Sequence, residues 1–370
     1  MNRIEKFIEL ASKNPEFEGA LVTSPQNRFY MLNMHSSAGT ILMLKDAAYF
    51  IIDFRYIELA QKSVKNAQVI MQTKLYDQLN ELLAKHGVKK LWIEESMSVG
   101  TMNTMKANLN AEVVTDSPMT TIINEMRQIK SREELEIIKA GQAITDAGFT
   151  HMLTQLEAGR SERDLAIELE TFMRKQGASG IAFSTILVSG KNSSLPHGVP
   201  STKLLEKGDF VTMDFGAAYG GYCTDMTRTV AIGHATDEMK HVYNTVLEAQ
   251  LMALKEIKAG KVCCDIDKIA RDHIYGAGYE GRFGHSLGHS FGIDVHETPG
   301  FAIGNTTILQ PGMMLSVEPG IYLPDKFGVR IEDTIGCLNE YVGNAPTFEE
   351  AMNMIVDYIY NNYNVKYELY

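Results

Sequence analysis

Along the first 125 residues, segments with the apolar spacing of a strand alternate with segments with the apolar spacing of a helix. Apolar positions three or four apart predict helices at 2–13, 55–64, 76–86 and 99–108, and short apolar runs predict strands near 19–24, 39–44, 47–52, 68–72, 90–94 and 112–115. We therefore expect a mixed α/β N-terminal domain over residues 1–125. Within it, Asp53 is expected to cap the helix that follows, and Arg55 to pair with a neighbouring carboxylate.

A second domain is predicted over residues 126–370. Ser131 and Glu134 have the spacing of a capping box, so a long helix should begin there. Two helices and a hairpin then occur twice, about 101 to 104 positions apart, at 132–157, 161–176 and 209–231 and again at 236–258, 264–277 and 313–336. This repeat places Asp214 and Glu318 on equivalent strands.

The strongest functional signal lies in the first of these hairpins, residues 208–230. A two-residue turn at Gly220-Gly221 puts Asp225 opposite Gly216, two positions from Asp214 on the same face. The two carboxylates would then lie about 7 Å apart or less. Because buried charges of one sign need compensation, the hairpin predicts a metal site, with Gly216 leaving room for the metal.

The second hairpin carries another pair of acidic residues. A turn around Pro324-Asp325-Lys326 brings Glu318 and Glu332 roughly opposite each other. If the two hairpins are related by a pseudo-twofold axis, four carboxylates face one cavity, where they need compensating positive charge. Two divalent cations about 3.5–4 Å apart would supply it.

Composition excludes some classes of function. The 370 residues carry a formal net charge of −11, which argues against a nucleic-acid or anionic-membrane partner. No apolar run approaches a membrane span, and the N-terminus is an amphipathic charged helix, so a cytoplasmic enzyme is expected. The four cysteines include no C-x-x-C and are expected to be reduced and structural, with Cys223 as a packing thiol.

Histidines gather in the segment 281–300, which holds His285, His289 and His296 among glycines and serines. Such a loop lets the backbone approach a site closely, and it comes directly before Glu318. His197, which follows a strand predicted at 184–189, is by itself an ordinary loop residue.

Taken together, five motifs resemble the pita-bread metallopeptidases, the fold of methionine aminopeptidase, aminopeptidase P and prolidase. They are TMDFG with Asp214, YCTD with Asp225, GHSLGHSFGIDVHE with His289, SVEPGIY with Glu318 and GVRIED with Glu332. Residues 126 to about 345 resemble the catalytic domain, and residues 1–125 resemble the N-terminal domain of aminopeptidase P, prolidase and creatinase. The resemblance implies an α/β (α+β) chain with a mixed α/β domain followed by a pseudo-twofold pita-bread domain.

A dinuclear centre follows from this resemblance. Asp214 would chelate one ion, Asp225 and Glu332 would bridge both ions, and His289 with Glu318 would complete the other. This oxygen-rich set suits manganese, with cobalt or zinc as alternatives. Activated water would attack the scissile carbonyl, with Glu318 as the proton shuttle.

Substrate contacts are implied as well. His197 and His296 match two histidines that flank the substrate, one at the carbonyl or leaving nitrogen and one that stabilises the tetrahedral intermediate. His285 and Arg330 match positions that line the pocket for the residue after the scissile bond, usually proline, and Tyr322 matches a tyrosine of the family motif.

Several activities remain open on these residues. We expect first an Xaa-Pro aminopeptidase that acts on peptides with proline in the second position, and as the alternative an Xaa-Pro dipeptidase (prolidase). A metal-free creatinase-like hydrolase and a non-catalytic binding protein are further alternatives. We also expect a homodimer, by analogy, and the tyrosine-rich segment after residue 341 could form a terminal helix, a dimer contact or a substrate rim.

Overall fold

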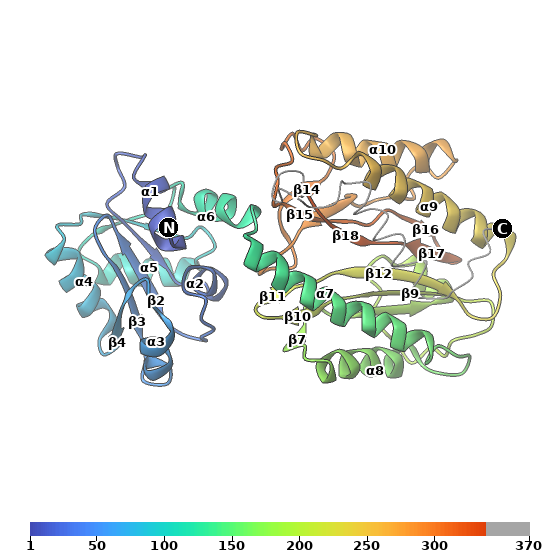
Figure 1. The fold of residues 1–370 in the computed structure, drawn as a ribbon, viewed down its shortest axis with the longest axis horizontal. Coiled ribbons are helices and arrows are strands. Elements are labelled where there is room, and N and C mark those ends of the chain that lie inside the picture. Colours follow the sequence, from blue (N-terminus) through green and yellow to red (C-terminus); the bar gives the residue numbers. More distant parts are fainter. Residues whose placement is uncertain (338–370) are drawn as a thin grey trace. The chain divides into compact units, whose positions relative to one another are not determined.

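The computed structural model describes residues 1–337. These residues fold as two compact units, Met1–Arg127 and the part of the chain from Gln128 onward (Figure 1). The tyrosine-rich segment after residue 341 lies outside the described residues, so its role stays a prediction.

The first unit is built on one six-stranded sheet in the order β4-β3-β2-β1-β5-β6. Its strands are β1 (Gly19–Val22), β2 (Thr40–Leu44), β3 (Ala48–Ile52), β4 (Gln68–Met71), β5 (Lys90–Ile93) and β6 (Glu112–Val114). Only β2 runs antiparallel to its two neighbours, and the other pairs are parallel. All six predicted strands are confirmed, because their apolar runs form the buried sheet.

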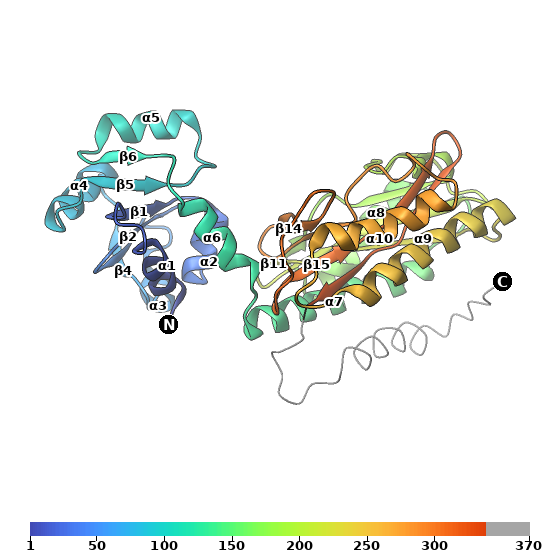
Figure 2. The ribbon, with the colours of Figure 1, turned by 90° about the horizontal axis from the view of Figure 1, so that it is seen from above.

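Six helices accompany this sheet (Figures 1 and 2). They are α1 (Arg3–Ala11), α2 (Pro25–Leu32), α3 (Ile57–Ser63), α4 (Leu75–Lys85), α5 (Val99–Asn108) and α6 (Met119–Gln128). The four predicted helices are confirmed, and α2 and α6 are additional. The sequence did carry a signal for α2, since Ser24 accepts a hydrogen bond from the Asn27 N–H and Pro25 occupies the first helical turn.

The prediction for Asp53 is wrong. The residue before α3 is Tyr56, and its side chain makes no capping hydrogen bond. The Asp53 carboxylate instead accepts from the backbone N–H and the guanidinium of Arg55. The carboxylate that pairs with Arg55 is therefore Asp53 itself, and its bond to a side chain two residues away competes with capping.

The second unit contains two helix pairs. The first pair is α7 (Arg132–Leu153) and α8 (Glu162–Lys175), and the second is α9 (Asp237–Glu256) and α10 (Cys263–Gly276). The members of each pair pack together, and the two pairs lie on opposite sides of the strands (Figure 1). The predicted capping box is confirmed, because Ser131 and Glu134 exchange both hydrogen bonds at the start of α7.

The strands of this unit form four sheets, two of which share a topology. They are β7 (Gly180–Ile181), β8 (Ile186–Ser189), β9 (Phe210–Phe215), β10 (Ala217–Tyr219), β11 (Tyr222–Cys223), β12 (Met226–Ala231), β13 (Gly288–Ser290), β14 (Glu297–Phe301), β15 (Met314–Val317), β16 (Gly320–Leu323), β17 (Phe327–Arg330) and β18 (Asp333–Gly336). A short 3-10 helix, η1 (Gly190–Ser194), follows β8. The order β8-β9-β12 corresponds to β13-β15-β18, which confirms the repeat.

The first hairpin has the predicted register. Tyr219 pairs with Tyr222 and Phe215 with Met226, so Asp225 lies opposite Gly216. The expected reason for this glycine is wrong, however. A Cβ atom at Gly216 would lie 1.8 Å from the Thr224 carbonyl oxygen, so the glycine is needed for the close approach of backbone and not to leave room for a metal.

The second hairpin also has the predicted register, because Gly320 pairs with Arg330 and Val317 with Asp333. Glu318 therefore lies opposite Glu332, as predicted. The two acidic pairs are not equivalent by the repeat, since the partner of Asp214 is Thr227. The repeat thus supplies an asymmetric arrangement of acidic residues.

Apolar side chains of α9 and α10 form the core of the second half together with β15–β17, and those of α7, α8 and β9 form the core of the first half. Cys223 is buried and its Sγ contacts the Ile293 carbonyl oxygen at 3.6 Å, as expected for a packing thiol. Within residues 1–337, no helix is long and apolar enough to cross a membrane.

Candidate metal centre

A cavity of about 520 Å³ opens in the second unit where the two halves of the repeat meet. All five predicted metal ligands line it, namely Asp214, Asp225, His289, Glu318 and Glu332. Four of the five other predicted site residues line it as well, namely His197, His285, His296 and Arg330. Tyr322 does not belong to the lining.

The five predicted ligands come from strands and from the breaks between strands. Asp214 lies on β9 and His289 on β13, whereas Asp225 lies between β11 and β12. Glu318 and Glu332 occupy the two breaks that separate the β15–β18 ladder from the β16–β17 ladder. Residues at such breaks can turn their side chains into a cavity because the neighbouring ladder pairs hold the backbone on both sides.

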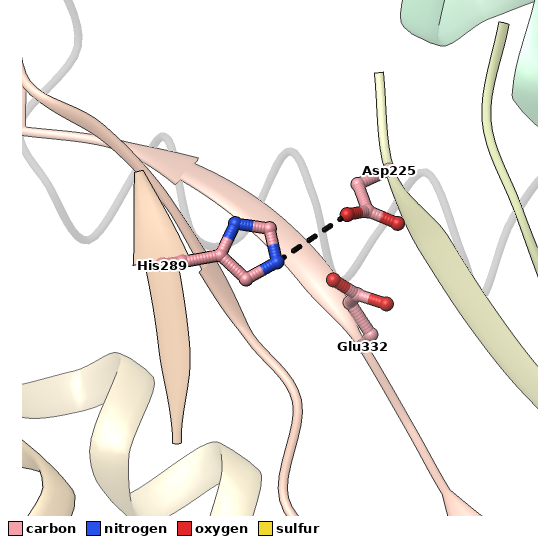
Figure 3. A group of neighbouring side chains, drawn as sticks. All are labelled: Asp225, His289 and Glu332. Atoms are coloured by element: carbon pink, nitrogen blue, oxygen red, sulfur yellow. Dashed lines mark ion pairs between the residues drawn. The ribbon is translucent and has the colours of Figure 1, made fainter. Parts of the chain in front are cut away.

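Three of these side chains converge closely (Figure 3). Asp225, His289 and Glu332 each offer a ligand atom, and these atoms lie within 4.8 Å of one another. His289 Nε2 lies 3.6 Å from a carboxylate oxygen of Asp225 and 3.3 Å from Glu318 Oε1. These distances suit one or more ions held among the four side chains.

The donor set fits divalent cations. Among the described residues, Asp214 Oδ1, Asp225 Oδ1 and Glu332 Oε1 are buried without a hydrogen-bond partner. Buried polar atoms are almost always paired, so three unpaired carboxylate oxygens on one cavity wall indicate that a cation belongs there.

The pKa values of the cavity carboxylates in the metal-free protein also indicate a cation site. Burial raises the pKa of Asp225 well above its usual value, and the nearby Glu332 raises it further. Burial raises the pKa of Glu332 well above its usual value too, with Glu318 adding to the effect, and it raises the pKa of Glu318 to about 7. Carboxylates that resist ionisation together would all ionise beside divalent cations.

Two cavity histidines are held neutral by the same burial. Burial lowers the pKa of His289 to about 4, and the nearby His296 lowers it further. Burial also lowers the pKa of His285 to about 4. A neutral imidazole is the form that binds a metal, and His289 Nδ1 is already engaged with the Ser290 carbonyl oxygen at 3.2 Å, which leaves Nε2 for the centre.

Arg330 is the positive charge next to the carboxylates. Its guanidinium lies 2.5 Å from Asp214 Oδ2 and 2.7 Å from the Tyr322 hydroxyl. Burial disfavours its charge, but Tyr322, Asp214 and Glu318 outweigh this and raise its pKa well above its ordinary value. Tyr322 also bonds His285 Nε2 at 2.9 Å, so it lies behind two residues of the lining.

Sequence reasoning missed two residues that hold predicted ligands in place. The Thr227 hydroxyl donates to Glu332 Oε2 at 2.7 Å, and Ser316 donates to Glu318 Oε1 at 2.9 Å. Thr227 and Glu332 also form an isolated backbone bridge that joins the two halves. Their places two positions from Asp225 and Glu318 could have identified them, but hydroxyl residues are too common in strands for the sequence to single them out.

Two halves of one topology around a shared acidic cavity define the pita-bread class of folds. Residues 136–337 match the model of metallopeptidase family M24, and residues 3–129 match that of the creatinase/prolidase N-terminal domain. The chain therefore belongs to metallopeptidase family M24, which makes it a metal-dependent peptidase.

Three relatives illustrate where the chain lies in this family. An Xaa-Pro dipeptidase of Pyrococcus horikoshii is 36% identical over 335 residues, which cover 90% of this chain and 93% of the relative. The structure of an Xaa-Pro dipeptidase from Bacillus anthracis is 42% identical, with a TM-score of 0.88 over 91% of this chain and 94% of that one. The structure of an X-Pro aminopeptidase from Thermotoga maritima is 36% identical, with a TM-score of 0.81 over 91% and 95%.

Proposed function

We propose that this protein is an Xaa-Pro dipeptidase whose two divalent ions are held by Asp214, Asp225, His289, Glu318 and Glu332. The observation that carries the proposal is the set of three buried, unpaired carboxylate oxygens in one cavity with His289. When bound, the ions would supply Lewis acidity and an activated water. Manganese suits an oxygen-rich set with one imidazole, and cobalt or zinc are the alternatives.

The cavity residues divide the remaining tasks. Glu318, whose Oε1 accepts from Ser316, is placed to take the proton of the attacking water and to pass it on to the leaving nitrogen. His197 and His296 are exposed at the cavity, where they can donate to the substrate carbonyl. Apolar lining from Phe183, Ile186 and Val295 suits a proline ring, which brings no N–H to satisfy.

The names of the relatives support the dipeptidase over the aminopeptidase that the motifs alone favoured. The structure from Bacillus anthracis, at 42% identity, is that of an Xaa-Pro dipeptidase, whereas the aminopeptidase from Thermotoga maritima is 36% identical. The substrate would then be a dipeptide with proline in the second position.

One observation keeps the Xaa-Pro aminopeptidase as a second candidate. In an Xaa-Pro dipeptide the proline carries the C-terminal carboxylate, and a buried carboxylate needs a cation beside it. Among the described residues that line the cavity, Arg330 is the one lysine or arginine, and it already binds Asp214, Tyr322 and the Pro196 carbonyl oxygen. A longer peptide carries no charge at that point.

Turnover of matched peptides decides between these candidates. We expect the manganese-loaded enzyme to cleave Ala-Pro with a higher kcat/KM than Ala-Pro-Ala, with activity lost on chelation and restored by manganese better than by cobalt or zinc. The reverse order of the two peptides would assign the aminopeptidase. Cleavage of neither peptide would refute the proposed function, and size measurement in solution would test the expected homodimer.

A further inference from the structure

A buried ion pair lies outside the cavity lining and includes Lys130, near the start of the second unit in the sequence. Lys130 Nζ lies 3.1 Å from Glu297 Oε2, and the two side chains are 1% and 8% exposed. Neither residue lines the cavity. Burying two charges costs solvation energy, so such a pair is weak evidence for stability and invites a search for a positional role.

The contacts of this pair reach strands and loops that carry cavity residues. Lys130 Nζ also donates to Ser290 Oγ at 3.3 Å, and Ser290 directly follows the ligand His289. Glu297 directly follows His296 on the chain and pairs with Ser290 across β13 and β14. One ammonium group thus joins the strand of a metal ligand to the residue beside a substrate-facing histidine.

The other oxygen of Glu297 orders the connecting loop. Glu297 Oε1 accepts from the backbone N–H groups of Ile293 at 2.9 Å and Asp294 at 3.2 Å. A Cβ atom at Gly292 would lie 3.0 Å from both Glu297 carboxylate oxygens, so the loop wraps closely around this carboxylate. The carboxylate therefore fixes the loop that connects His289 to His296.

The same loop touches the hairpin of the first half. The Cys223 N–H donates to the Gly292 carbonyl oxygen at 2.6 Å, and Cys223 lies two residues before the ligand Asp225. The rings of His289 and His296 approach each other with centroids 4.3 Å apart. A shift of the loop would therefore move His296 relative to His289 and loosen a contact beside Asp225.

We propose that Lys130 is a positioning residue that acts through Glu297 to hold the 291–296 loop, and with it His296, in place over the metal centre. The backbone of Lys130 is anchored in turn, since its N–H donates to the Gly312 carbonyl oxygen at 2.9 Å. The kinetic part of this proposal rests on the proposed function, because His296 acts on substrate only in a peptidase.

The test compares Lys130→Met with Lys130→Met/Glu297→Gln in the full-length, manganese-loaded protein. In the single variant the Glu297 carboxylate loses the ammonium group of Lys130, so we expect kcat per metal-loaded site to fall by about 10–100-fold with KM nearly unchanged. The double variant also removes the negative charge of Glu297, while the glutamine oxygen can still accept from the loop, so it should recover most of the lost kcat.

The matched control is Lys203→Met. Lys203 forms a less deeply buried ion pair in the same unit, 2.6 Å from Asp209 Oδ2, and neither residue contacts the loop or the cavity. We expect this change to lower the melting temperature without lowering kcat. If Lys130→Met behaved like this control, with kcat within twofold of wild type, the positioning role would be overturned.

Hydrogen exchange separates this proposal from the proposed function. We expect the amides of Ile293 and Asp294 to exchange faster in Lys130→Met and to regain protection in the double variant, whatever the enzyme cleaves. Unchanged exchange in Lys130→Met would overturn the proposal. An inactive wild-type protein would refute the proposed function alone, because the exchange result would still decide the role of Lys130.

Discussion

Replacement of Glu318 by Gln should stabilise the metal-free protein at alkaline pH. Burial raises the pKa of Glu318 from 4.5 to about 7. Each tenfold change in proton affinity is worth about 1.4 kcal/mol, so an ionised Glu318 costs the metal-free folded state about 3 kcal/mol. A glutamine avoids this cost, and its oxygen can still accept from Ser316.

The pH dependence has a definite sign. The folded state holds the Glu318 proton more tightly than the unfolded chain, so the contribution of Glu318 to wild-type stability falls as pH rises from about 4.5 to about 7 and then levels off. At pH 5 the metal-free wild type and Glu318→Gln should differ by less than about 1 kcal/mol, and at pH 8 by about 3 kcal/mol. Manganese should reverse the order, since it binds the folded wild type more tightly than the variant.

Urea unfolding in the presence of a chelator measures these differences. Far-UV circular dichroism follows both units, whereas the single tryptophan, Trp92, is buried in the first unit and gives an internal control. We expect the glutamine to shift the circular-dichroism transition and to leave the Trp92 transition in place. Equal urea midpoints of the two proteins at pH 8, or a less stable variant, would refute the inference that burial of the ionised Glu318 carboxylate destabilises the metal-free protein.

Three further predictions follow from the site and its support. Asp225→Asn should abolish activity and the stabilisation by manganese while the chelated protein stays folded by circular dichroism; retained manganese stabilisation would contradict its role as a ligand. Gly216→Ala should lower the unfolding free energy by about 1–3 kcal/mol or more, because its Cβ meets the Thr224 carbonyl at 1.8 Å; an unchanged urea midpoint would refute this. Tyr322→Phe removes one hydrogen-bond acceptor of Arg330. The loss of one buried hydrogen bond should lower kcat/KM about 10-fold, and a change below twofold would place Tyr322 outside the site.

The fold could be predicted in large part from the sequence. Apolar runs located the strands of the first unit, and apolar residues at helical spacing located most helices. Both patterns arise because these elements bury apolar side chains against the core. Helix α2 was missed because its four apolar residues, 29–32, are consecutive and show no helical spacing, and its start depends on the local cap at Ser24. The cap at Asp53 was predicted wrongly because Arg55 offers a stronger, charged donor two residues away.

The ligand set was also accessible from the sequence. A hairpin register follows from its turn, so Gly220-Gly221 alone placed Asp225 opposite Gly216, and the second turn placed Glu318 opposite Glu332. The repeat then suggested a shared cavity. The repeat alone did not show the asymmetry of the two halves, but it follows from the same hairpin register, which places Thr227 opposite Asp214.

The sequence by itself thus determined most of the elements, the hairpin registers and the predicted residues of the candidate centre, because these depend on local turns, periodicity and motifs. Only the tertiary structure decided which groups lie behind the centre. The contacts of Lys130 with Glu297 and of Arg330 with Asp214 join residues more than 100 positions apart. Such pairs depend on how the two halves pack, and no local pattern in the chain records that packing.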